Sequence, residues 1–170
     1  MIHVGVLTVS DKGSRGERED ISGKQITEMI ARIDGQLSYY KIIPDEKVLI
    51  KKELMKAVDE LNLDLIFTTG GTGFAERDVT PDATFEVIEK LVPGICEIIR
   101  NESFKKTKRA ILSRAISGIR GKCLIINLPG SPKGVRESLE IVLDILPHGI
   151  GVLKGQASEC GKSEKMDKDL

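Results

Sequence analysis

Two hydrophobic patterns alternate along the chain. Nearly continuous apolar runs, typical of parallel strands buried on both faces, occupy residues 2–9, 37–43, 64–69, 116–119 and 122–128. Between them, apolar residues recur every three or four positions, as in helices with one buried face, over residues 21–34, 50–61, 81–91, 93–104 and 133–146. This alternation predicts a three-layer α/β/α fold around a mostly parallel central sheet.

The remaining segments are polar. Residues 13–20 contain glycine and read as a loop, and Arg120-Gly121 predicts a tight turn between two strands. Residues 155–170 are charged and offer almost no apolar anchors. Such a stretch cannot bury enough surface to offset the entropy of ordering it. We therefore expect one domain over residues 1–154 and a flexible C-terminal tail over residues 155–170.

Composition narrows the class of protein. The 170 residues include 26 Lys plus Arg and 26 Asp plus Glu, a zero formal net charge that argues against a nucleic-acid or membrane partner. No apolar run reaches the length of a membrane span, and the N-terminus lacks the basic start of a secretory signal. The three cysteines are far apart and form no CxxC pair. We expect a cytoplasmic protein with reduced thiols.

Three loops at predicted strand ends carry the candidate chemistry. They are Ser10-Asp11-Lys12-Gly13, Gly70-Gly71-Thr72-Gly73 and Pro129-Gly130-Ser131-Pro132-Lys133. Ligands of open α/β sheets bind outside the carboxyl ends of the strands. Three such loops at one sheet edge would line a cleft.

The middle loop is the most informative of the three. Glycines let backbone N–H groups approach an anion, and the following Arg77-Asp78-Val79-Thr80-Pro81-Asp82 brings a cation and carboxylates to a helix start. Arginine suits phosphate, and Asp78 suits Mg²⁺. The plainer reading is a tight βα turn with Asp82 at the helix start. The loop lacks the P-loop ending and the dinucleotide glycine spacing, which disfavours a nicotinamide-dependent oxidoreductase.

Five motifs in order resemble one family. The block from Thr69 to Ala83 is similar to the first signature of the MogA/MoaB family of molybdenum-cofactor biosynthesis proteins. Residues 7–11, 43–46, 110–114 and 127–132 resemble four further segments of the family, so the likeness covers about residues 1–153. The resemblance implies a MogA-like fold, a homotrimer, and conversion of molybdopterin and Mg-ATP to adenylyl-molybdopterin and pyrophosphate. It also suggests a downstream metal-insertion protein as a partner.

The resemblance also implies which residues act. Asp45 and Asp78 match the two family acids tied to activity, and we expect them to hold Mg²⁺. Asp45 alone would read as ordinary helix-capping chemistry. The residues implied in nucleotide or molybdopterin binding are Ser10, Asp11, Thr69, Gly70, Gly71, Thr72, Gly73, Arg77, Thr80, Pro81, Ser113, Pro129, Gly130, Ser131, Pro132 and Lys133. Many relatives have Asn or Gln where this chain has Ser131, so the side-chain amide of those relatives is replaced by a hydroxyl here.

Two other functions remain open at this stage. A non-catalytic molybdopterin-binding protein of the same family is the main alternative, although retention of Asp45 and Asp78 favours the enzyme. Metal insertion is disfavoured, because molybdotransferases with this fold carry extra domains. The scarcity of histidine is no objection to adenylyl transfer, since the attacking phosphate is already ionised at neutral pH. His3 and His148 are expected to be structural.

Overall fold

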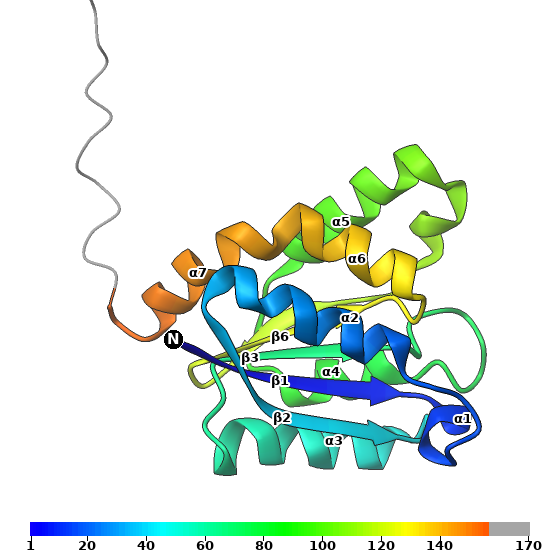
Figure 1. The fold of residues 1–170 in the computed structure, drawn as a ribbon, viewed down its shortest axis with the longest axis horizontal. Helices are drawn as coiled ribbons and strands as arrows, with labels where there is room; N and C mark the ends of the chain where they lie inside the picture. Colours follow the sequence, from blue (N-terminus) through cyan, green and yellow to red (C-terminus); the bar gives the residue numbers. More distant parts are fainter. Residues whose placement is uncertain (157–170) are drawn as a thin grey trace, which may run out of the picture.

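A computed structural model, describing residues 1–156, shows a six-stranded sheet with strand order β2-β1-β3-β6-β5-β4 (Figure 1). The strands are β1 (Ile2–Val9), β2 (Gly35–Ile43), β3 (Leu65–Thr69), β4 (Lys90–Leu91), β5 (Ser117–Arg120) and β6 (Cys123–Leu128). Strands β2, β1, β3 and β6 are parallel, whereas β5 runs antiparallel to both of its neighbours. The predicted mostly parallel sheet is confirmed.

Helices cover both faces of this sheet (Figure 1). The α-helices are α1 (Asp11–Ser14), α2 (Ile21–Met29), α3 (Lys47–Met55), α4 (Thr80–Val87), α5 (Pro93–Lys106), α6 (Pro132–Val142) and α7 (Leu146–Leu153). Shorter turns are η1 (Ile30–Ile33), η2 (Lys56–Glu60), η3 (Lys108–Leu112) and η4 (Leu143–Ile145). Helices α2, α5, α6 and α7 pack on one face, and α3 and α4 on the other. No helix within residues 1–156 is long and apolar enough to cross a membrane.

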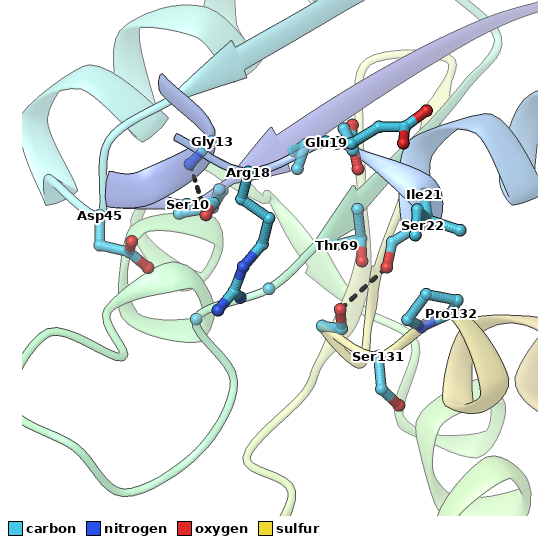
Figure 2. Close-up of a pocket in the computed structure, with 16 residues that line it drawn as sticks. Ser10, Gly13, Arg18, Glu19, Ile21, Ser22, Asp45, Thr69, Ser131 and Pro132 are labelled. Carbon is cyan, nitrogen blue, oxygen red and sulfur yellow. Dashed lines mark hydrogen bonds between the residues drawn. The ribbon is translucent and has the colours of Figure 1, made fainter. Parts of the chain in front are cut away.

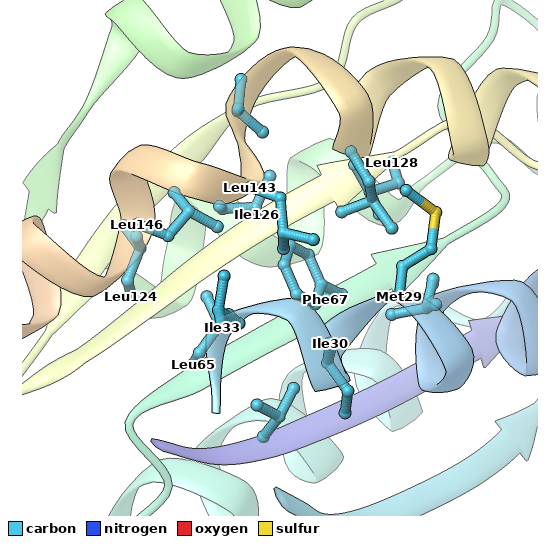
Figure 3. Close-up of a cluster of buried hydrophobic side chains, with 14 of the residues drawn as sticks. Met29, Ile30, Ile33, Leu65, Phe67, Leu124, Ile126, Leu128, Leu143 and Leu146 are labelled. Atoms are coloured by element: carbon cyan, nitrogen blue, oxygen red, sulfur yellow. The ribbon is translucent and has the colours of Figure 1, made fainter. Parts of the chain in front are cut away.

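Two apolar clusters hold the three layers together. In the larger one, Phe67 of β3 is fully buried and lies among Met29, Ile30 and Leu143 from the covering elements (Figure 3). Full burial of one such side chain is worth roughly 1.5–3 kcal/mol. The parallel strands are thereby fixed against helices on both faces, so their carboxyl ends form a defined edge.

The predicted helix over residues 81–91 ends early. Helix α4 stops at Val87, and Lys90–Leu91 form strand β4. The backbone N–H of Glu89 donates to the Ile119 carbonyl at 2.8 Å, and that of Val92 donates to the Ser117 carbonyl at 2.8 Å. Val92 also precedes a proline, which disfavours helical geometry there.

The predicted single helix over residues 133–146 is interrupted. Helix α6 ends at Val142, the turn η4 follows, and α7 continues from Leu146. Pro147 has no N–H with which to continue the hydrogen-bond ladder, and its ring fits a first helical turn. The break therefore has a local cause in the sequence.

Short segments between and after the main elements also differ from or match the sequence predictions. Residues Asp11–Ser14 form the short helix α1, so the predicted loop over residues 13–20 begins inside it. The turn at Gly121, with φ of 56°, joins β5 and β6 as predicted. The predicted tail over residues 155–170 lies outside the described residues, apart from residues 155 and 156.

Candidate functional site

A cavity of about 730 Å³ lies at the carboxyl ends of the parallel strands (Figure 2). Half of its sixteen lining residues were predicted from the sequence, and they lie at or just after the carboxyl ends of β1, β2, β3 and β6. These eight are Ser10, Asp45, Thr69, Gly70, Gly71, Gly130, Ser131 and Pro132. The structure therefore brings the separate strand-end loops together, as expected for parallel strands.

The glycine loop after β3 needs its glycines. Gly70 and Gly71 have φ of 99° and 63°, in the region that side chains disfavour. A Cβ on Gly70 would collide with the Val9 carbonyl of β1. A Cβ on Gly71 would collide with the Thr80 hydroxyl and lie 3.2 Å from Asp45 Oδ1. The loop thus presents bare backbone to the cavity.

Thr80 lies beneath this loop. Its side chain is fully buried, and its hydroxyl makes no hydrogen bond within residues 1–156. Its backbone N–H donates to the Gly71 carbonyl at 3.1 Å. An unpaired buried hydroxyl costs stability. Packing alone therefore does not explain why a threonine lies directly under Gly71.

The loop after β6 closes against the glycine loop. The Thr69 hydroxyl donates to the Pro129 carbonyl at 2.7 Å, and a Cβ on Gly130 would lie 3.3 Å from Gly70 Cα. The Ser22 hydroxyl of α2 donates to the Gly130 carbonyl at 2.9 Å. These contacts make one continuous wall from three distant segments.

Asp45 and Asp11 bind each other's backbone at the ends of β2 and β1. The N–H of Asp11 donates to Asp45 Oδ2 at 2.8 Å, and the N–H of Asp45 donates to Asp11 Oδ1 at 3.1 Å. Arg77 donates to both oxygens of Asp11, at 2.6 and 2.7 Å. Asp45 Oδ1 makes no hydrogen bond to any residue that the structure describes.

The pKa values of the two carboxyl groups are shifted in opposite directions. The hydrogen bonds from Arg77 hold the pKa of Asp11 below its ordinary value. Burial raises the pKa of Asp45 above its ordinary value, because desolvation disfavours the charged form. A positive charge placed beside Asp45 would therefore favour its ionised form.

Asp78 lies after the C-terminal end of the glycine loop. Its Oδ2 accepts the Ala75 N–H at 2.8 Å, and it lines neither this cavity nor the smaller one that adjoins it. Arg114, which sequence reasoning did not select, donates to the Gly73 carbonyl at 3.0 Å and to the Asp78 carbonyl. It also pairs with Asp82 at 2.7 Å. The loop's shape is therefore fixed from outside the cavity.

A second cavity of about 320 Å³ adjoins the first. Thr72, Gly73, Ser113 and Pro129 line it, and Ser131 lines both cavities. Several of its other lining residues are apolar or come from α5 and η3. Together the two cavities offer room for a two-part substrate.

Other predicted residues lie around the site rather than in it. Arg77 lines a neighbouring hollow with Asp45, and Pro81 stands in the first turn of α4 beside Asp82. Lys133 is exposed at the start of α6 and lines neither main cavity.

Sequence reasoning missed one wall of the large cavity. Arg18, Glu19, Asp20 and Ser22 line it, from the loop and helix that follow β1. The loop over residues 13–20 follows the same strand end as Ser10, and this position was the signal that could have found them.

The site offers a metal ion only part of a ligand set. Within residues 1–156, no group of three or more His, Cys, Asp or Glu side chains is placed to hold a metal ion. Asp45 supplies an unpaired carboxylate oxygen, and oxygen ligands are what Mg²⁺ prefers. Mg²⁺ commonly takes its remaining ligands from phosphates and water. The donor set therefore fits an ion that arrives with a phosphate-bearing substrate.

Comparisons of the sequence with known proteins point to one family. Residues 5–148 match the family model described as "Probable molybdopterin binding domain". The chain is 49% identical to the molybdopterin adenylyltransferase of Helicobacter pylori over 91% of this chain and 89% of the relative. It is 40% identical to the molybdopterin adenylyltransferase of Escherichia coli K12 over 88% and 80% of the two chains.

The solved structures agree with the family match. The structure of the molybdopterin biosynthesis enzyme MoaB from Thermus thermophilus matches with a TM-score of 0.87 and 50% identity, covering 94% of this chain and all of that one. The resemblance noted from the sequence motifs is confirmed, and the chain belongs to the MogA/MoaB family of molybdenum-cofactor biosynthesis proteins.

Proposed function

We propose that the protein adenylylates molybdopterin, using Mg-ATP and releasing pyrophosphate. The observation that carries this proposal is the bare glycine backbone at Gly70 and Gly71, which faces a cavity of about 730 Å³ at the sheet edge. Backbone N–H groups at such a turn suit phosphate oxygens. The names of the Helicobacter and Escherichia relatives support the same reaction.

In the proposed reaction the terminal phosphate of molybdopterin attacks the α-phosphorus of ATP. A bond forms between this phosphate oxygen and the α-phosphorus, and the bond to the β-phosphate oxygen breaks, so pyrophosphate leaves. The attacking oxygen is already ionised, so positioning and charge neutralisation provide most of the acceleration. The glycine loop and Ser10 would hold the nucleotide phosphates, and Ser113 and Pro129 of the second cavity would hold the rest of the substrate pair.

Asp45 and Asp78 are the acids to which we assign the Mg²⁺ ion. When bound, the ion would neutralise charge on the transferring phosphate. Asp45 contributes an unpaired oxygen at the cavity wall, and Asp78 holds the loop through Ala75. Asp11 orients Asp45 through the reciprocal bonds between carboxylate and backbone N–H, and Arg77 holds the Asp11 carboxylate in turn.

We further propose a homotrimer in the cytoplasm that delivers its product to a metal-insertion protein. These proposals rest on the family resemblance. The rival proposal is a binding protein that holds molybdopterin without turnover, and retention of both Asp45 and Asp78 favours the enzyme over it.

The deciding experiment supplies purified protein with molybdopterin, ATP and Mg²⁺, and measures pyrophosphate release. Stoichiometric release with formation of adenylyl-molybdopterin is expected. Tight molybdopterin binding without pyrophosphate would favour the binding protein instead. In the same assay Asp78→Asn should release no pyrophosphate, and Asp144→Asn is its matched control, because Asp144 pairs with Arg32 on the surface and lines neither of the two cavities.

A further inference from the structure

Carboxylates outnumber cations in the lining of the large cavity. Among its lining residues, all within the described part of the chain, Glu19, Asp20 and Asp45 carry carboxylates and only Arg18 carries a cation. A nucleotide triphosphate adds several negative charges to this wall. A cation that faces the cavity and has no ion-pair partner would therefore offset part of this negative charge.

Arg18 has no ion-pair partner within residues 1–156, although its loop contains several other charged side chains. The neighbouring charged side chains are bound to one another or to the sheet. These contacts are Arg15 with Glu17 at 2.7 Å, Lys24 with Glu19 at 2.6 Å, and Asp20 with the Gly23 N–H at 2.8 Å and the Thr8 hydroxyl. Arg18 itself makes no hydrogen bond or ion pair within residues 1–156.

The position of Arg18 suits a ligand. Its side chain extends from the loop into the cavity, between Asp45 and Thr69 in the view of Figure 2. The other arginine close to this site, Arg77, is already bound to both oxygens of Asp11. The ion pair of Glu19 with Lys24 and the hydrogen bonds of Asp20 hold the loop directly after Arg18 in place, so the guanidinium starts from a supported backbone.

We propose that Arg18 is a substrate-binding residue that binds the phosphate oxygens of the nucleotide opposite Gly70 and Gly71. The inference rests on the proposed function, because it takes the ligand to be the nucleotide. A guanidinium offers parallel N–H donors that match two phosphate oxygens, and such charge-assisted bonds are among the strong ones. The glycine loop then binds the phosphates with neutral backbone, and Arg18 supplies the charge.

The test is calorimetry on Arg18→Gln with Mg-ATP, inorganic pyrophosphate and adenosine as three separate probes. The affinities for Mg-ATP and pyrophosphate are expected to fall about 10- to 100-fold, the range of one charge-assisted contact. Adenosine affinity should not change. Arg15→Gln is the matched control, since it removes the same charge from the same loop but outside the cavity lining. Arg18→Lys should recover part of the loss.

Three results would overturn the inference. These are unchanged Mg-ATP affinity in Arg18→Gln, an equal loss in Arg15→Gln, or an equal loss for adenosine. Pyrophosphate release by the wild type is measured in parallel. Release together with an unaffected Arg18→Gln refutes only the role of Arg18. A phosphate-specific loss without any release in the wild type refutes only the proposed reaction.

Discussion

Substituting Gly71 by alanine tests the glycine loop most sharply. The residue has φ of 63°, and an alanine Cβ there would collide with the hydroxyl of the fully buried Thr80. Left-handed geometry costs a non-glycine residue about 1–2 kcal/mol. Overpacking a buried neighbour adds about 1–3 kcal/mol. The free energy of unfolding should therefore fall by about 2–5 kcal/mol.

Gly121→Ala provides the matched control. Gly121 has φ of 56° in the β5–β6 turn, and a Cβ there meets nothing within 4 Å. This variant should lose only the backbone portion, about 1–2 kcal/mol. The difference between the two variants measures the close packing under Gly71.

The assay is urea unfolding of both variants, with calorimetry for Mg-ATP on the folded proteins. Gly71→Ala should also weaken Mg-ATP binding, whereas Gly121→Ala should not. In a Thr80→Ala background, the cost of Gly71→Ala should shrink toward that of Gly121→Ala. Equal destabilisation by both glycine variants, with unchanged nucleotide affinity, would refute the reasoning.

Three further outcomes are expected. Asp78→Asn should abolish adenylyl transfer yet keep its circular dichroism spectrum; wild-type turnover in a folded variant would remove Asp78 from the mechanism. Burial raises the pKa of Asp45 above 3.8, so its charged form costs stability as the pH rises above that value. Asp45→Asn should therefore raise the urea midpoint at pH 7, and this gain should disappear as the pH falls toward 4. A gain in urea midpoint that did not change with pH would contradict a cost from burying the Asp45 charge. Truncation after Lys154 keeps the 2.9 Å ion pair between Lys154 and Asp64, so melting temperature, oligomer mass and turnover should match those of the full chain. A lower oligomer mass or melting temperature would instead indicate that the tail docks on a neighbouring subunit.

Much of the fold could be predicted from the sequence because its patterns are local. Strand β1 has the predicted bounds, since eight residues run without a turn-forming break. The segment around Leu91 misled the prediction, because the spacing of Val87 and Leu91 also suits a helix. Its pairing with β5 is a tertiary contact that periodicity does not contain.

The candidate site could be predicted to the same limit. Glycines and acids at strand ends identified the edge, because parallel strands bring their carboxyl ends together. Arg18 and Arg114 were missed, since their roles depend on where a loop folds back and not on a local pattern. The pairing of Asp11 with Asp45 likewise joins residues 34 positions apart.

The central claim is that the strand-end cavity binds the phosphates of ATP on the glycine loop. A crystal structure with Mg²⁺ and a non-hydrolysable ATP analogue tests it most directly. We predict phosphate density against the backbone of Gly70 to Gly73, with Asp45 and Arg18 facing it. Nucleotide density elsewhere, with this cavity filled only by solvent at saturating ligand, would contradict the account.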